Sequence, residues 1–206
     1  TTPTDHPCPH EDRNPSDRAA DRAGVWVILD ESFVEYCQAL TCLPQLPSFP
    51  RLIILRSFTK FYGLPGLRVG YSVSSLPIAA LLKQYQPPWS VNAMAQVAAE
   101  AAMSDQGHAR RCLAYVKKER ARLIRQLSSI SGLTVFSFPA NFLLVDLPRS
   151  SRTREFAAAL RRQGMLIRDC SSVEGCTQRS FRIAIRTKVE NDRLVSALGR
   201  LLRGVG

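Results

Sequence analysis

Two short, uninterrupted apolar runs constrain the fold of this 206-residue chain more than any other feature of its sequence. The first run spans Val25–Leu29 and ends at Asp30, and the second spans Leu52–Leu55 and ends at Arg56. Apolar runs without polar alternation are typical of strands that are buried on both faces, as in a parallel sheet. A third candidate strand follows at Arg68–Val73. The pattern therefore predicts an α/β domain with a mostly parallel sheet.

Helical spacing replaces this pattern after the third strand. It predicts helices at Ile78–Tyr85, Asn92–Met103 and His108–Ile130, the last of them long and amphipathic. From about Leu133 short strands and helices alternate, which predicts a small α+β domain behind an incomplete α/β domain. In that part, strands are expected at Leu133–Phe138, Phe142–Leu147, Met165–Arg168 and Phe181–Arg186, and helices at Thr153–Arg162 and Glu190–Arg203.

These elements divide the chain into four expected parts. Residues 1–24 are polar, charged and Pro-containing, so we expect a disordered tail or linker there, and it has no apolar core of the kind that a secretory signal needs. A partial large domain follows over 25–107. A bridging helix over 108–131 then leads to the small α+β domain over 132–206.

Composition excludes some functions and leaves others open. The formal net charge of +11 permits nucleic-acid binding, but the basic residues are scattered and no zinc finger, basic zipper or aromatic RNA-binding motif accompanies them. No apolar run is long enough to cross a bilayer. We therefore expect neither a nucleic-acid nor a membrane partner.

The six cysteines contain no C-x-x-C pair and no zinc-ribbon spacing. Free thiols in a reducing cytoplasm are the expected state. The run His6, Cys8, His10 has ligand-type residues but lies in the expected tail, and we predict no metal site.

Polar residues that can perform chemistry follow the candidate strands. Asp30 ends the first strand, Ser57, Thr59 and Lys60 follow the second, and Arg68 begins the third. A nucleophilic lysine, a carboxylate partner, and hydroxyls with an arginine for a phosphate would form a coherent set at one edge of a sheet. Each residue also has an ordinary alternative role as a helix cap, a turn residue or a solvated charge.

The segment from Ser57 to Tyr71, SFTKFYGLPGLRVGY, closely resembles the lysine segment of fold-type-I pyridoxal-phosphate enzymes of the aminotransferase class I/II group. The segment Asp30–Phe33, DESF, is similar to the aspartate motif of that group. The resemblance implies that Lys60 forms the Schiff base with pyridoxal phosphate and that Asp30 faces the pyridine nitrogen. It also implies that Ser57, Thr59 and Arg68 bind the cofactor phosphate. Phe33 stands where many relatives carry a tyrosine, and it cannot make the hydrogen bond of that tyrosine to the ring hydroxyl.

Two families within this group compete for the chain, the threonine-phosphate decarboxylases and the histidinol-phosphate aminotransferases. Four segments and Phe33 resemble the decarboxylases more closely; the segments are 55–62, 88–93, 166–170 and 181–186. This resemblance, which runs from Val25 to the end of the chain, implies decarboxylation of L-threonine O-3-phosphate to aminopropanol phosphate, a building block of cobalamin. It also implies a homodimer when the enzyme is complete.

The predicted strand Phe181–Arg186 adds an argument from periodicity. A period of two places Arg182 and Arg186 on the face opposite Phe181. With Arg168 on a candidate neighbouring strand, they suit a substrate that has both a carboxylate and a phosphate. The resemblance assigns the carboxylate to Arg182, and we assign the substrate phosphate to Arg168; exposed charges on an edge strand are the alternative.

Relatives in this group also carry a large amino-terminal stretch that this sequence does not match. It contains a Gly-rich turn for the cofactor phosphate, an aromatic residue that stacks on the ring, and an Asn-Pro motif. Asn14-Pro15 has the letters of that motif, but too few residues separate it from Asp30. A catalytically incompetent fragment that binds a partner is therefore an alternative function for this chain.

Overall fold

The computed structural model describes residues 24–203, which fall into two units that divide between Ala109 and Arg110. The predicted tail lies outside the described residues except for Gly24, and the His6, Cys8, His10 run and Asn14-Pro15 lie outside them entirely. None of the helices in the described part is long and apolar enough to span a bilayer.

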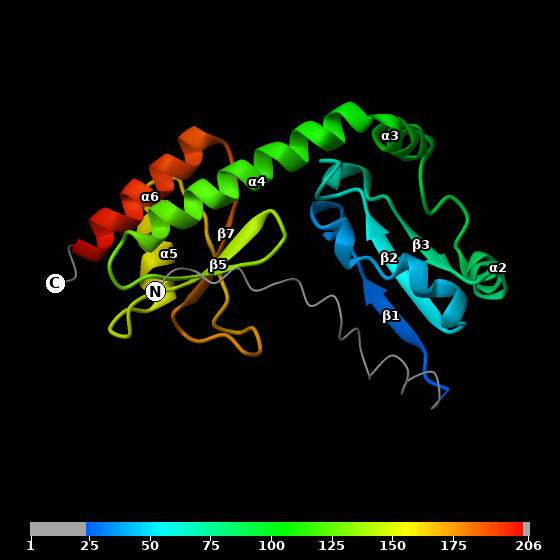
Figure 1. Ribbon diagram of the computed structural model, residues 1–206, viewed down its shortest axis with the longest axis horizontal. Helices are drawn as coiled ribbons and strands as arrows, with labels where there is room; N and C mark the ends of the chain where they lie inside the picture. The colour runs from blue at the N-terminus through cyan, green and yellow to red at the C-terminus, as the bar shows by residue number, and fades with distance from the viewer. Residues whose placement is uncertain (1–23, 204–206) are drawn as a thin grey trace. The chain divides into compact units, whose positions relative to one another are not determined.

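Three strands form the sheet of the first unit, in the order β1-β2-β3 (Figure 1). β1 (Val27–Asp30) runs parallel to β2 (Leu52–Ser57), with Asp30 opposite Leu55. β3 (Gly70–Ser74) runs antiparallel to β2, with Gly70 opposite Ser57. The predicted strands therefore exist, but the third one does not run parallel to the other two.

The burial predicted for the first strand is wrong. β1 is an edge strand among the described residues, and its Ile28 side chain is 66% exposed. β2 lies between its two neighbours, and its residues Leu52, Ile53 and Ile54 are all buried. An apolar run alone predicts the strand, whereas burial depends on which strands lie beside it.

Short 3-10 helices make up most of the connections in this unit. Three of them follow β1, namely η1 (Val34–Tyr36), η2 (Gln38–Leu40) and η3 (Leu43–Ser48). A fourth, η4 (Pro65–Leu67), occupies the Pro65-Gly66 segment between β2 and β3. Proline is tolerated in the first turns of η3 and η4 because the backbone N–H that it lacks has no partner within the helix there.

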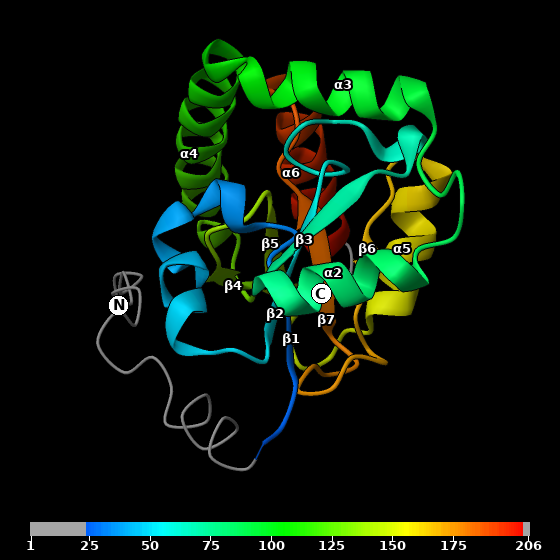
Figure 2. The same ribbon diagram turned by 90° about the vertical axis from the view of Figure 1, so that its right-hand side faces the viewer.

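Two helices follow β3. α2 (Leu76–Tyr85) contacts β3, as Figure 2 shows, and begins after Ser75 with Pro77 in its first turn. α3 (Ala93–Ser104) is capped by Asn92, whose side chain accepts a hydrogen bond of 2.8 Å from the Ala95 backbone N–H. Both agree with the predicted helices to within two residues.

The second unit contains a four-stranded antiparallel sheet in the order β4-β5-β7-β6. Its strands are β4 (Thr134–Ser137), β5 (Phe142–Asp146), β6 (Arg168–Asp169) and β7 (Ser180–Ala184). The helices are α4 (Gln106–Ser128), most of which belongs to this unit, α5 (Thr153–Arg162) and α6 (Lys188–Arg203) (Figure 1). β6 is shorter than predicted and begins three residues later, because residues 165–167 do not pair with β7.

The two faces of this sheet differ in composition. Leu143 pairs with Ile183 and Val145 with Phe181, and all four side chains are at most 2% exposed. The residues between them, Leu144 and Arg182, point to the opposite face because side chains alternate along a strand. The apolar face joins the core with buried residues of the three helices, which include Leu123, Leu127, Phe156, Leu160 and Leu198. The other face is only partly covered and carries the predicted substrate arginines.

Candidate active site

The antiparallel direction of β3 places three predicted site residues at one edge of the first sheet. Asp30 ends β1, Ser57 ends the parallel strand β2, and Arg68 lies two residues before β3 begins at Gly70. Because β3 runs in the opposite direction to β2, its beginning lies beside the end of β2. A parallel third strand would have placed Arg68 at the far edge.

Gly70 is required for this close approach. A Cβ atom at this position would lie 2.6 Å from the Arg56 carbonyl oxygen, too close for any side chain. Glycine therefore allows β3 to start directly against the end of β2, which fixes both ends of the loop that carries Lys60.

Aromatic residues orient the loop between β2 and β3. Phe58 and Phe61 are 3% and 5% exposed, and both rings contact Tyr62, with centroids 5.0 and 5.1 Å away. Phe58 also belongs to a hydrophobic cluster with Ala95 and Ala99 of α3. Burial of the two phenylalanines leaves Thr59 and Lys60, which lie between them, at the surface of the unit.

The hydroxyl groups of this loop form a compact pair. Ser57 Oγ and Thr59 Oγ1 are 2.8 Å apart, and the Thr59 backbone N–H donates to Ser57 Oγ at 3.2 Å. Two adjacent hydroxyls can both donate hydrogen bonds to a phosphate group.

Arg68 supplies a cation from a strained backbone conformation. It is one of two non-glycine residues among the described ones with positive φ, at φ 53° and ψ 49°, and its guanidinium donates to the Pro65 carbonyl at 3.1 Å. Left-handed backbone is unfavourable for residues with a Cβ atom, and such strain is concentrated at functional sites.

Asp30 is ionised at neutral pH. Hydrogen bonds from Ser32, including one of 2.8 Å from its backbone N–H, hold the pKa of the Asp30 carboxyl below its usual value, and the charge of Lys60 lowers it further. A carboxylate of this kind can keep a pyridine nitrogen protonated.

Phe33 contacts the predicted catalytic lysine. Lys60 Nζ lies 5.2 Å from the centroid of the Phe33 ring, within the range of a cation–π contact. Where many relatives would offer a phenolic hydroxyl, this chain offers the face of an aromatic ring.

A buried ion pair lies next to these residues and was not predicted. Arg56 donates to Glu31 Oε2 at 2.7 and 3.2 Å and to Thr41 Oγ1 at 2.7 Å, while the Cys42 backbone N–H donates to Glu31 Oε1 at 2.6 Å. The pair connects the residue after Asp30 to the residue before Ser57 and so links the ends of β1 and β2. The signal for it in the sequence was Arg56, a charged residue that directly follows the apolar segment 52–55 within the predicted sheet.

The second unit holds the two predicted substrate arginines. Arg168 of β6 lies directly opposite Arg182 of β7, and both side chains are exposed. No ion pair among residues 24–203 includes either guanidinium. Like charges that face each other across a ladder destabilise a sheet, so this pair is typical of a binding site for anions.

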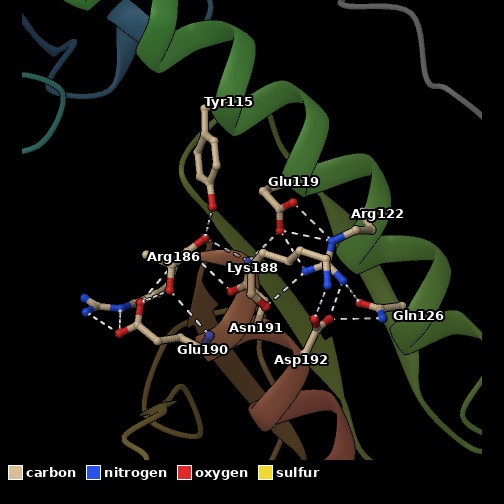
Figure 3. Close-up of polar contacts among 10 residues, drawn as sticks. Tyr115, Glu119, Arg122, Gln126, Arg186, Lys188, Glu190, Asn191 and Asp192 are labelled. Atoms are coloured by element: carbon tan, nitrogen blue, oxygen red, sulfur yellow. Dashed lines mark hydrogen bonds and ion pairs between the residues drawn. The ribbon is translucent and has the colours of Figure 1, made fainter.

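Arg186 has a different environment from the other two arginines. Its guanidinium donates to Glu190 Oε1 at 2.6 and 2.9 Å, and its backbone oxygen accepts hydrogen bonds from Tyr115 and Asn191 (Figure 3). It lines a cavity of about 330 Å³ that contains neither Arg168 nor Arg182. The structure therefore separates Arg186 from the pair that the sequence grouped with it.

Figure 3 shows that Arg186 belongs to a polar network between α4 and α6. Glu119, only 3% exposed, accepts hydrogen bonds from Arg122 and from the Asn191 side chain, and Arg122 also pairs with Asp192. At the start of α6, Thr187 and Glu190 form a capping box: the Thr187 backbone N–H donates to Glu190 Oε2 at 3.2 Å, and the Glu190 backbone N–H donates to Thr187 Oγ1 at 3.4 Å. The sequence T-x-x-E before an apolar run was the signal for this cap, and it marks a structural rather than a catalytic feature.

Metal chemistry has no candidate in the described part of the chain, where no three His, Cys, Asp or Glu side chains gather in a way that could hold an ion. By contrast, the lysine, carboxylate and phosphate-type ligands at the edge of the first sheet fit pyridoxal phosphate. The α/β fold and this set of residues define the class as pyridoxal-phosphate enzymes of fold type I.

Comparison with known proteins identifies the family. Residues 17–198 match the model of the family "Aminotransferase class I and II", and the chain belongs to that family. Pyridoxal phosphate is therefore the cofactor that family membership indicates.

Among individual relatives, the chain is 38% identical over 181 residues to threonine-phosphate decarboxylase of Salmonella typhimurium, covering 87% of this chain and 49% of the relative. It is 29% identical over 187 residues to histidinol-phosphate aminotransferase of Methanocaldococcus jannaschii, and the match covers 90% of this chain and 50% of that relative. The chain thus spans about half the length of these relatives.

Solved structures of a histidinol-phosphate aminotransferase and of a threonine-phosphate decarboxylase resemble the fold of this chain. Histidinol-phosphate aminotransferase from Clostridium acetobutylicum matches with a TM-score of 0.86 and 30% identity, covering 91% of this chain and 57% of that one. L-threonine-O-3-phosphate decarboxylase from Porphyromonas gingivalis matches with a TM-score of 0.78 and 26% identity, and the match covers 89% of this chain and 57% of that one. Together with the family match, these structures confirm the predicted fold class and the predicted membership of the aminotransferase class I/II group.

Proposed function

We propose that the protein is a pyridoxal-phosphate-dependent decarboxylase of the threonine-phosphate decarboxylase type, acting on L-threonine O-3-phosphate. One observation carries this choice within the family: Arg168 and Arg182 face each other across β6 and β7 without an ion-pair partner among the described residues. Two guanidinium groups on adjacent strands suit a small substrate with both a carboxylate and a phosphate. Histidinol phosphate has a phosphate but no carboxylate, whereas the amino acceptor 2-oxoglutarate has two, so the choice of the decarboxylase also rests on the 38% identity to threonine-phosphate decarboxylase of Salmonella typhimurium.

In this proposal the first unit binds the cofactor. Ser57, Thr59 and Arg68 hold its phosphate, and the ionised Asp30 keeps the proton on the ring nitrogen. Lys60 Nζ would hold the cofactor covalently, and its amine would donate a proton to the substrate α-carbon. When bound, the cofactor supplies an electron sink for the charge that remains on that carbon after carbon dioxide leaves.

The second unit binds the substrate anions. Arg182 holds the carboxylate and Arg168 the phosphate, in bidentate contacts that guanidinium groups can make. The product would be aminopropanol phosphate, for use in cobalamin synthesis. We expect a reducing, cytoplasmic location and, for the complete enzyme, a homodimer.

A histidinol-phosphate-type aminotransferase is the second candidate, favoured by the TM-score of 0.86 to the enzyme from C. acetobutylicum. The two reactions differ in their products. Carbon dioxide release from carboxyl-labelled phosphothreonine supports the decarboxylase, whereas amino transfer between histidinol phosphate and 2-oxoglutarate supports the aminotransferase and contradicts our choice.

Cofactor binding is tested first, by borohydride reduction in the presence of pyridoxal phosphate followed by mass mapping of the modified peptides. We expect label on Lys60, none in Lys60→Ala, and an unchanged pattern in Lys83→Ala, which removes an exposed lysine of the same unit. Label spread over several lysines, with Lys60 no more reactive than Lys83, would show that this chain does not form the cofactor site.

A further inference from the structure

The guanidinium of Arg182, the proposed carboxylate ligand, lies over an aromatic ring. Its guanidinium carbon lies 4.8 Å from the centroid of the Phe142 ring, within the range of a cation–π contact. The register explains the contact: Leu144 of β5 lies opposite Arg182, and Phe142, two residues away, lies opposite Ala184. Phe142 and Arg182 are therefore diagonal neighbours on the partly covered face of the sheet, at a separation that aromatic and long side chains can span.

This contact suits a guanidinium that must bind an anion. A carboxylate partner would fix the side chain but would also neutralise the charge that the substrate needs. A stacked ring contacts only the planar face of the guanidinium, and its N–H donors point outward in the plane, where a carboxylate binds them in pairs. No ion pair among residues 24–203 includes Arg182, so no described carboxylate performs this role instead.

Arg168 makes such support necessary. β7, which carries Arg182, lies between β5 and β6, and Arg168 on β6 is directly opposite Arg182. Repulsion between the two cations favours conformations in which they move apart. The Phe142 ring lies on the β5 side and attracts the guanidinium toward it. The aromatic contact thus opposes the disorder that repulsion would otherwise cause.

We propose that Phe142 is a positioning residue that holds the Arg182 guanidinium for the carboxylate of the substrate, and so favours ligands that carry one. This inference rests on the proposed function, because it assigns the carboxylate to Arg182. Phe142 acts through Arg182 and does not itself contact the reacting atoms.

The test combines a structural and a binding readout on the purified protein without cofactor. Stacking on Phe142 shifts the Arg182 Nε–H proton resonance upfield; Phe142→Leu removes the shift and Phe142→Tyr retains it. In titrations, Phe142→Leu weakens binding of O-phospho-L-threonine about fivefold. It leaves 1-amino-2-propanol O-phosphate, which lacks the carboxylate, unchanged, and Phe142→Tyr restores wild-type affinity.

The matched control is Phe136→Leu. Phe136 is a 41% exposed aromatic residue on the same face, opposite Leu144 rather than beside Arg182, and its replacement leaves both affinities unchanged. Equal weakening of both ligands by Phe142→Leu, or no upfield shift in the wild type, overturns the role of Phe142 alone. Failure of the wild type to bind either ligand overturns the proposed function and this inference together.

Discussion

Arg56 donates two hydrogen bonds to a single carboxylate oxygen of Glu31, and the two side chains are only 12% and 5% exposed. Breaking a buried pair by removing one partner leaves the other charge without compensation, which costs about 3–5 kcal/mol. We therefore expect Arg56→Leu to lower the free energy of unfolding of the first unit by about that amount. The two tryptophans of the chain, Trp26 and Trp89, both lie in this unit, so urea denaturation followed by tryptophan fluorescence reports on it selectively.

The control for this measurement is Lys83→Leu, which removes an exposed cation near the end of α2. A loss for Arg56→Leu no greater than that of Lys83→Leu would show that the ion pair does not stabilise the end of the sheet. Rescue by Arg56→Lys is not expected, because lysine cannot reproduce the contacts of Arg56 to both Glu31 and Thr41.

Glu35 makes the stability of the same unit depend on pH in an unusual direction. It is only 4% exposed, and one of its carboxylate oxygens is buried without a hydrogen-bond partner. Burial raises the pKa of the Glu35 carboxyl above its ordinary value of 4.5; the charge of Glu31 acts in the same direction, and those of Arg56 and Lys60 oppose it. Because the pKa of Glu35 is raised in the folded state, its contribution to the stability of the unit is fully present below pH 4.5. This contribution is lost as the pH rises through the folded-state pKa.

Glu35→Gln removes this titration. We expect the variant to gain stability relative to the wild type between pH 4 and pH 7, as measured by urea denaturation at both values. Glu100→Gln, at an exposed position on α3, should show the same difference from the wild type at each pH. A constant difference for Glu35→Gln as well would mean that the pKa of Glu35 is the same in the folded and unfolded states, which contradicts the effect of burial.

The sequence predicted the elements and the cofactor because each leaves a local signal. Apolar runs, helical spacing and the segment from Ser57 to Tyr71 are all readable over short windows. The helices α2, α3 and α5 accordingly begin and end within two residues of the predicted positions.

Strand direction and tertiary partners leave no such signal. The direction of β3 depends on the short connection through Pro65–Leu67, which an apolar pattern does not encode. The contact between Phe142 and Arg182 joins residues far apart in sequence and depends on the register of β5 and β7. Periodicity placed Arg182 on the correct face but could not show what supports it.

Arg68 offers a test of whether strain is retained for function. Its left-handed backbone costs about 1 kcal/mol relative to glycine. We expect Arg68→Gly to raise the free energy of unfolding of the first unit by about this amount while it weakens binding of pyridoxal phosphate. Arg68→Ala keeps the strain, so it should weaken cofactor binding equally but without the gain in stability. If both variants bind the cofactor as well as the wild type, Arg68 is not a ligand of its phosphate.

The network around Glu119 predicts acid sensitivity of the second unit. Hydrogen bonds from Arg122, and then from Asn191, hold the pKa of the Glu119 carboxyl below its usual value despite burial. Its stabilising contribution is therefore present above the unfolded pKa and is lost as the pH falls through the folded one. We expect Glu119→Gln to destabilise this unit by about 3 kcal/mol at pH 7 and by less in acid.

Hydrogen exchange of peptides from α4 and α6, followed over a urea series, measures this loss in the second unit. Lys188→Gln serves as the control because its pair with Asp192 is exposed, and it should change protection little. Equal effects of the two substitutions would argue that burial adds nothing to the Glu119 interaction.

The pair Arg168 and Arg182 predicts an opposition between stability and binding. Because the two cations face each other across the ladder, Arg168→Gln removes a repulsion and should stabilise the second unit by roughly 0.5 kcal/mol. The same change should weaken O-phospho-L-threonine at least tenfold, since it removes the proposed phosphate ligand. Arg161→Gln, at an exposed position on α5, should alter neither quantity. If Arg168→Gln stabilises the second unit without weakening O-phospho-L-threonine, the substrate phosphate binds elsewhere. If the variant loses both stability and affinity, Arg168 has a structural partner and its charge does not serve ligand binding alone.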